Sequence, residues 1–212
     1  MCGIIAVVRR PSSRAVPDAE TVRSLIDTGL DTLTQVVDGA LPIDRGISEA
    51  ADMLRDADAL LRGVAGVQAL TGDRTLLTEI DQLTAAIESA ITRIETTLDA
   101  DPNVDADRLE VINAELIRLK DGAWAVRHDR LRTARAVEDL AGPDAGPAAV
   151  EAFLSIQQAL SALDRLEVRG RDSAGLQVLV RNNGLDLASA ELDRVLQERG
   201  ADALLTTMSV RH

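Results

Sequence analysis

Residues 73–99, DRTLLTEIDQLTAAIESAITRIETTLD, form the longest regular pattern in this 212-residue sequence and decide most of its fold. Their large apolar side chains recur at steps of three and four residues, which is the spacing that one face of an α-helix requires. The apolar positions are Leu76, Ile80, Leu83, Ile87, Ile91, Ile94 and Leu98. We therefore predict one long amphipathic helix here.

A turn and a second apolar seam follow this stretch. Asp101-Pro102-Asn103 is typical of a turn, because these residue types favour turn conformations over a continuing helix. The next seam consists of Val104, Ile112, Leu116, Leu119, Ala123 and Val126. Two facing seams predict an antiparallel helical hairpin with coiled-coil character.

Helical spacing also extends towards the N-terminus. Residues 18–37 carry it, and Ser48 is a candidate cap for a helix that runs to about Arg62, where Gly63 and Gly66 are expected to interrupt the pattern. The chain is predicted to be helical from residue 18 to about residue 140, between linkers at 11–17 and 141–147. A further amphipathic helix is predicted at 148–167, and another from Ser189 onward.

Two short segments favour strands instead. Residues 3–8, Gly-Ile-Ile-Ala-Val-Val, form an apolar run rich in β-branched side chains that ends at Pro11 after two arginines, as a buried strand would. Residues 175–181 are predicted to be a second strand. Asn182-Asn183-Gly184 favours a hairpin turn, which would lead to a return strand at 185–188.

Composition and charge exclude several classes of protein. The formal net charge is −12, which opposes binding to nucleic acid or to anionic membranes. One cysteine excludes an internal disulfide framework, and no stretch approaches a membrane span. The first ten residues have their apolar run before their positive charges, the reverse of a secretory signal. We expect a cytoplasmic protein.

Cys2 is the first residue with chemical potential. Removal of Met1 would make Cys2 the N-terminal residue, whose α-amine has a pKa near ~7.7–8.0 and is partly neutral at cytoplasmic pH. Such an amine can accept the proton of the neighbouring thiol, so one residue supplies both nucleophile and base. Gly3 lets a substrate approach the backbone closely.

A second motif lies between the predicted helix 148–167 and the strand 175–181. It reads Leu-Glu-Val-Arg-Gly-Arg-Asp-Ser-Ala-Gly over residues 166–175. Gly170 permits a turn, Arg169 and Asp172 form a close opposite-charge pair, and Ser173 can bond to local backbone. On its own this pattern is also compatible with an ordinary helix-to-strand turn.

Together the two motifs resemble the glutaminase domain of glucosamine-6-phosphate synthases, which are class II, N-terminal-nucleophile glutamine amidotransferases. The resemblance rests on Met-Cys-Gly-Ile-Ile-Ala-Val at the start and Leu-Glu-x-Arg-Gly-x-Asp-Ser-Ala-Gly after a helix. It implies an αββα sandwich and hydrolysis of L-glutamine through a Cys2 thioester. The ammonia would pass to a sugar-phosphate isomerase domain that aminates fructose 6-phosphate.

The resemblance also implies roles for the motif residues. Arg169 matches an active-site arginine that shapes the surroundings of the nucleophile. Gly170, Asp172 and Ser173 match positions that hold the turn. We expect neither a metal nor a cofactor, since His128 has no second His or Cys nearby. Arg171 stands where the family usually has Tyr, and an amidophosphoribosyltransferase-like glutaminase is therefore an open alternative.

The sequence departs from the family in two ways. About 140 residues separate the first strand from the motif-bearing helix, which is the size of a small domain. The family's His-Thr-Arg-Trp segment, oxyanion-hole segment and amine-binding aspartate are absent from the 212 residues. We therefore expect the chain to be inactive alone, as an N-terminal fragment of the enzyme.

These observations give one expected organisation. The fold class is α+β, a partial sandwich interrupted by a mainly helical bundle, with helix dominant overall. Residues 1–10 would be the first strand with Cys2, 11–148 a helical insertion domain, and 149–212 the resumed glutaminase fold. The insertion is open to a role as lid, homo-oligomer contact or regulatory surface. A non-catalytic helical interaction protein with remnants of the fold is the rival interpretation.

Overall fold

The computed structural model describes residues 4–101, 105–166, 175–180, 184, 186 and 188–200. The chain divides into two compact units, Met1–Ala174 and Gly175–His212, and each is described by itself. Every regular element in the described residues is a helix. In the second unit that element is α8, Ala190–Gly200.

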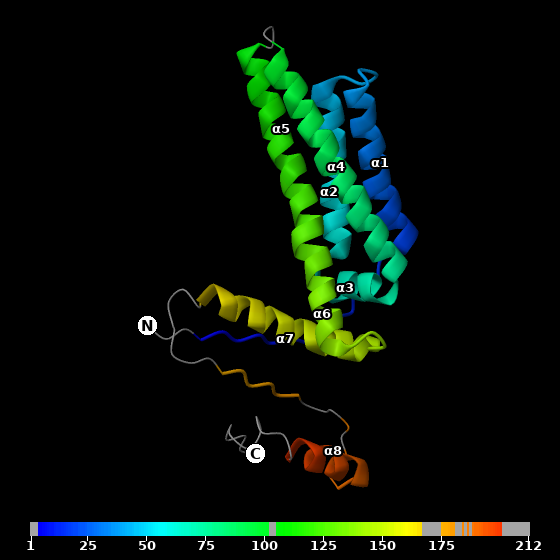
Figure 1. Cartoon of the computed structure of the whole chain (residues 1–212), viewed down its shortest axis with the longest axis vertical. Coiled ribbons are helices and arrows are strands. Elements are labelled where there is room, and N and C mark those ends of the chain that lie inside the picture. Colours follow the sequence, from blue (N-terminus) through cyan, green and yellow to red (C-terminus); the bar gives the residue numbers. More distant parts are fainter. Residues whose placement is uncertain are drawn as a thin grey trace. The chain divides into compact units, whose positions relative to one another are not determined.

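Four long helices of the first unit form a bundle in which successive helices alternate in direction (Figure 1). They are α1 (Ala19–Val37), α2 (Ile43–Leu61), α4 (Arg74–Ala100) and α5 (Ala106–Trp124). α1 packs against α2 and α4, and α5 packs against the same two helices from the other side. α4 and α5 run in opposite directions as predicted, but α4 packs mainly against α1 and α5 mainly against α2, so their apolar faces meet in a core that all four helices share.

The bundle core is aliphatic, as helical periodicity requires. Its fully buried side chains include Ile26, Leu33, Ile47, Leu54, Leu76, Ile80, Ile87, Ile94, Ile112 and Leu119. Aspartates cap three of the helices: Asp18 accepts from the Thr21 amide at 2.9 Å, and Asp73 and Asp105 do the same for α4 and α5. Each cap satisfies a backbone N–H that has no partner within its helix.

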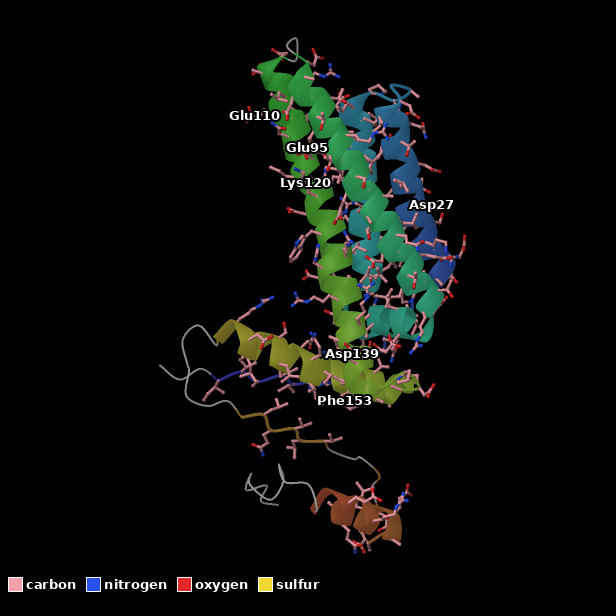
Figure 2. The ribbon with its side chains drawn as sticks, viewed as in Figure 1. Asp27, Glu95, Glu110, Lys120, Asp139 and Phe153 are labelled. Carbon is pink, nitrogen blue, oxygen red and sulfur yellow. The ribbon has the colours of Figure 1, made fainter. Side chains whose placement is uncertain are left out.

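Ion pairs join the outer surfaces of the bundle helices. Lys120 of α5 and Glu95 of α4 pair across the two helices, and both are labelled in Figure 2. Arg23 Nε lies 2.6 Å from Glu79 Oε2 and links α1 to α4. Because these pairs are partly exposed, each contributes little, and the buried aliphatic side chains account for most of the stability.

Four further elements form the base of the bundle. They are α3 (Gly63–Gly72), the π-helix η1 (Ala125–Leu131), α6 (Arg132–Ala141) and α7 (Pro147–Leu166). A second apolar cluster holds α3, α6 and α7 together: Val64, Val67, Val137, Val150 and Leu154, with Phe153 packed against it. Figure 2 labels Phe153 on α7 and Asp139 on α6 at this end of the unit.

The helix predictions need two corrections of detail. α2 begins at Ile43, earlier than the predicted cap at Ser48. Gly63 interrupts the helix as predicted, because α2 ends at Leu61 and α3 begins at Gly63, whereas Gly66 lies inside α3 and does not interrupt it. Gly63 has φ +68°, which turns the chain out of α2, and a Cβ on Gly66 would lie 2.0 Å from the carbonyl oxygen of Leu61. α7 and α8 lie where helices were predicted, at 148–167 and from Ser189.

The predicted α+β class is wrong: the described residues form an all-α structure without a β-strand. Residues 4–10 and 175–180 carry no strand, although strands were predicted there. Ile4 and Val8 are 94% and 93% exposed, so this segment is not the buried strand of a sandwich. β-branched residues favour a strand only where a neighbouring strand can accept their backbone hydrogen bonds, and the described residues supply none.

No helix in the described ranges is long and apolar enough to cross a membrane. The proposed division at residues 10 and 148 stays a prediction.

Candidate functional site

All the residues predicted to form the catalytic site lie outside the described residues. They are Cys2, Gly3, Arg169, Gly170, Asp172 and Ser173. Their roles stay predictions. The structure does describe the two segments that lead to them, which are residues 4–14 and helix α7.

The N-terminal segment is bound to α7 by side-chain hydrogen bonds. Arg9 donates from Nε to Ser155 Oγ at 2.7 Å and from Nη2 to Gln158 Oε1 at 2.6 Å. The Ser12 amide donates to Glu151 Oε1 at 3.0 Å. As the residue number rises from 9 to 12, the partner number on α7 falls. The segment therefore runs antiparallel to α7, and Figure 1 shows the two side by side.

This direction leads the start of the chain towards the C-terminal end of α7. Ile4 is two residues from Cys2, and Leu166 is three residues from Arg169. At roughly 3.5 Å per residue, an extended chain covers about 7 Å and about 11 Å over those steps. The described segments that lead to Cys2 and to Arg169 are thus bound to each other.

Arg14 fixes the linker after this segment to the bundle. Its Nη1 donates to the carbonyl oxygen of Arg62 at 2.9 Å, and its Nη2 donates to those of Ala59 and Leu60 at 2.8 and 2.9 Å. These carbonyl groups lie at the C-terminal end of α2, where the helix dipole favours a cation. The N-terminal segment is consequently held at both α7 and α2.

A cleft of about 350 Å³ lies between α7 and the η1–α6 segment. Its polar lining includes His128, Asp129 and Arg132 on one side and Gln157, Gln158 and Arg165 of α7 on the other. Gln158 is also the acceptor for Arg9, so the cleft and the N-terminal segment share a side chain.

The π-helix shapes one wall of this cleft. The rings of Trp124 and His128 stack with centroids 5.4 Å apart and planes inclined by 30°. Trp124 is the only tryptophan of the chain, and its side chain is 56% exposed. Single π-helical turns within α-helices occur frequently at functional sites, so η1 makes this side of the cleft a candidate functional site.

Arginines of the cleft differ in their partners. Arg130 Nε donates to Asp58 Oδ1 at 2.8 Å, and Arg62 Nε donates to Asp58 Oδ2 at 2.9 Å. The Asp58 side chain is only 4% exposed, so its two guanidinium partners compensate a buried charge. Arg132 and Arg165 have no such carboxylate among the described residues.

The carboxyl group of Asp81 in the bundle has a lowered pKa, and two neighbouring arginines are the cause. Partial burial raises the pKa of Asp81, but the hydrogen bond and charge of Arg135, together with Arg127, outweigh it and hold that pKa below its usual 3.8. Both arginines come from the η1–α6 segment, so Asp81 attaches that segment to α4. No cluster of three potential metal ligands occurs in the described part of the chain.

Sequence reasoning did not find the cleft. His128 was considered only as a metal ligand, and Gln157, Gln158 and Arg165 carried no signal of their own. Only the packing of α7 against α6 and α3 brings them opposite η1.

Comparison of the chain with protein-family models, curated proteins and solved structures found no match.

Proposed function

We propose that this chain carries the nucleophile of a glutamine-hydrolysing amidotransferase, with Cys2 as that nucleophile. One observation supports this more than any other. The segment after Cys2 lies antiparallel on the helix that precedes the Arg169–Ser173 turn, through Arg9 and Ser12. The described segments that adjoin these two motifs, which are more than 160 residues apart in the sequence, therefore meet on the same helix.

The chemistry follows from an N-terminal cysteine. After removal of Met1, the α-amine of Cys2 accepts the thiol proton, and Sγ attacks the carboxamide carbon of glutamine. The C–N bond breaks, the nitrogen takes up a proton and leaves as ammonia, and a γ-glutamyl thioester remains. Water then attacks the thioester, releases glutamate and returns the proton to the thiol. Arg169 stabilises the developing negative charges by its own positive charge.

The proposed acceptor follows from the resemblance. Ammonia would pass to a sugar-phosphate isomerase domain and convert fructose 6-phosphate to glucosamine 6-phosphate. A phosphoribosyl acceptor is the alternative within the same chemistry. We place this reaction in the cytoplasm, where a single thiol stays reduced.

The 212 residues do not supply a complete glutaminase site. Loss of one oxyanion-hole donor alone costs about 2.7–4 kcal/mol of transition-state stabilisation. The segments that would supply the oxyanion hole and the substrate clamps are absent from the sequence. Ammonia release from glutamine by the purified chain, lost on Cys2→Ala, would contradict the expected inactivity.

The reactivity of the thiol tests the nucleophile without requiring those missing segments. Cys2 is the only cysteine, so iodoacetamide labelling followed by mass spectrometry reports on it alone. We expect the Met1-processed chain to be alkylated with a midpoint below the usual thiol pKa of about 8.5. Arg169→Gln should move the midpoint upward, whereas Arg93→Gln on α4 should not. An ordinary midpoint that is unaffected by Arg169→Gln would refute the proposal.

A second candidate is a non-catalytic helical interaction protein. The observation in its favour is that all regular structure in the described residues is helical, with an aliphatic core to which α1, α2, α4 and α5 contribute most of the side chains. The coding sequence downstream of His212 separates the two candidates. A continuing frame with the missing substrate-binding segments supports the amidotransferase, and an immediate stop codon with stable expression supports the interaction protein.

A further inference from the structure

We propose that the cleft between η1–α6 and α7 binds the phosphoryl group of a small metabolite, held by the guanidinium groups of Arg132 and Arg165. This inference does not depend on the proposed glutaminase chemistry. It is based on the cleft, on the hydrogen-bond donors that line it, and on two arginines of its lining that have no carboxylate partner among the described residues.

The balance of charge in the cleft favours an anion. Three arginines line it, and Arg130 is already paired with Asp58. Arg132 and Arg165 have no carboxylate partner among the described residues, whereas Asp129 is the one carboxylate of the lining. The lining thus contains two arginines without a described carboxylate partner and one aspartate, in a protein whose formal net charge is −12. Unpaired arginines at a concave surface are a preferred environment for phosphate.

Neutral groups in the cleft add further donors. Ser161 and Thr133 supply hydroxyls, and Gln157 supplies an amide. The Oε1 of Gln158 is occupied by Arg9, which leaves its Nε2 with two N–H donors. A phosphate dianion has three terminal oxygens that accept several hydrogen bonds each, so it matches this excess of donors better than a cation or an apolar ligand would.

The size of the cleft indicates a small molecule. About 350 Å³ is near the lower end of the range for small-molecule sites, which is enough for a phosphate ester with a compact body. A nucleic acid would have to approach the acidic surface over a much larger area, which the net charge opposes. A small dianion feels mainly the nearby arginines, because more distant charges are screened beyond about 10 Å.

Trp124 provides a reporter within the native chain. It is the only tryptophan and stacks on His128, which lines the cleft. A phosphate bound beside His128 changes the surroundings of the stacked rings, and this change alters the emission of the indole. Calorimetry of the same 212-residue chain measures binding independently of the reporter.

The test titrates inorganic phosphate and glycerol 3-phosphate at pH 7 and constant ionic strength, with succinate as the carboxylate control. We expect saturable heat and a Trp124 emission change, with glycerol 3-phosphate binding tighter than inorganic phosphate. Arg132→Gln and Arg165→Gln should each raise the half-saturating concentration by at least about fivefold, because each removes a charged hydrogen bond. Arg93→Gln, an exposed arginine of α4 outside the cleft, should leave it unchanged.

Several results would overturn the inference. Absence of saturable heat well above millimolar concentrations would exclude the site. Equal weakening by Arg93→Gln would show non-specific charge attraction, and succinate binding as tightly as glycerol 3-phosphate would exclude phosphoryl recognition. Equal affinity for inorganic phosphate and glycerol 3-phosphate would show that the cleft does not recognise the organic part of a phosphorylated metabolite. Both cleft arginines are exposed, so their substitution should leave the helical circular dichroism intact, and Arg132→Lys should retain part of the affinity.

Discussion

Substitution of Arg9 by methionine should release the N-terminal segment from α7 while leaving the helical bundle intact. The side chain makes one half-buried hydrogen bond, to Ser155, and one exposed bond, to Gln158. Hydrogen bonds of charged groups contribute about 1.5–3 kcal/mol when they are protected from water. Solvent screening reduces that value here, so we expect the two bonds together to contribute about 1–2 kcal/mol.

That free energy corresponds to a roughly 5–30-fold shift in the equilibrium between bound and released segment. The readout is hydrogen exchange at the Ser12 amide, which donates to Glu151 in the bound segment. In Arg9→Met its protection should fall by that factor, while urea denaturation of the bundle should change by less than about 0.5 kcal/mol.

Arg10→Met is the matched control, because it removes the same charge from an exposed neighbour without a partner among the described residues. Unchanged protection of the Ser12 amide in Arg9→Met, or an equal loss in Arg10→Met, would refute the docking of this segment on α7.

Three further predictions concern the bundle. Ile80→Ala should lower the free energy of unfolding by about 2–5 kcal/mol in urea melts, because Ile80 of α4 is fully buried in the bundle core; a loss below about 1 kcal/mol would argue against that core. Gly66→Ala should cost about 1–3 kcal/mol through overlap with the Leu61 carbonyl, whereas Gly72→Ala, with open space around it, should be neutral or stabilising by thermal melting. The pKa of Asp81 is lowered in the folded state, so its stabilising effect is present above the unfolded pKa and disappears as the pH falls through the folded value. The stability difference between the native chain and Asp81→Asn should therefore be largest near neutral pH and vanish in strong acid, and a difference independent of pH would contradict it.

The helices could be predicted because their signal is local. The seam from Leu76 to Leu98 has the period of a helix, and α4 covers it from Arg74 to Ala100. The same holds for α7, which begins one residue before the predicted start. In each case a repeated apolar spacing selects the helix and also defines the face that is buried.

The strands failed because their signal depends on partners. Ile4 to Val8 have the composition of a buried strand, yet the described residues offer no neighbouring strand to pair with them. Gly66 was misinterpreted for a similar reason. Its lack of a side chain serves the close approach to the Leu61 carbonyl rather than an interruption of the helix, and a single sequence does not distinguish the two.

The candidate sites divide in the same way. Cys2 and the Arg169–Ser173 turn could be singled out from sequence because their residue types carry chemistry. The attachment of residues 9–12 to α7 could not, since it depends on Ser155, Gln158 and Glu151, which have no distinctive pattern. The arginines of the cleft converge only through the packing of α7 against the η1–α6 segment.

Disulfide trapping tests most directly whether this arrangement brings the start of the chain to the turn after α7. In the variant Arg169→Cys, mild oxidation should link the new cysteine to Cys2 within one chain, because such a bond requires Cα atoms within about 7 Å. The control Arg93→Cys on α4 should form no such link, and adding Arg9→Met to Arg169→Cys should slow the reaction. The account is contradicted if Arg169→Cys forms no intramolecular disulfide with Cys2, or forms it no faster than Arg93→Cys does. In that case the two motifs do not meet, and Cys2 does not lie beside the Arg169–Ser173 turn that the proposed active site requires.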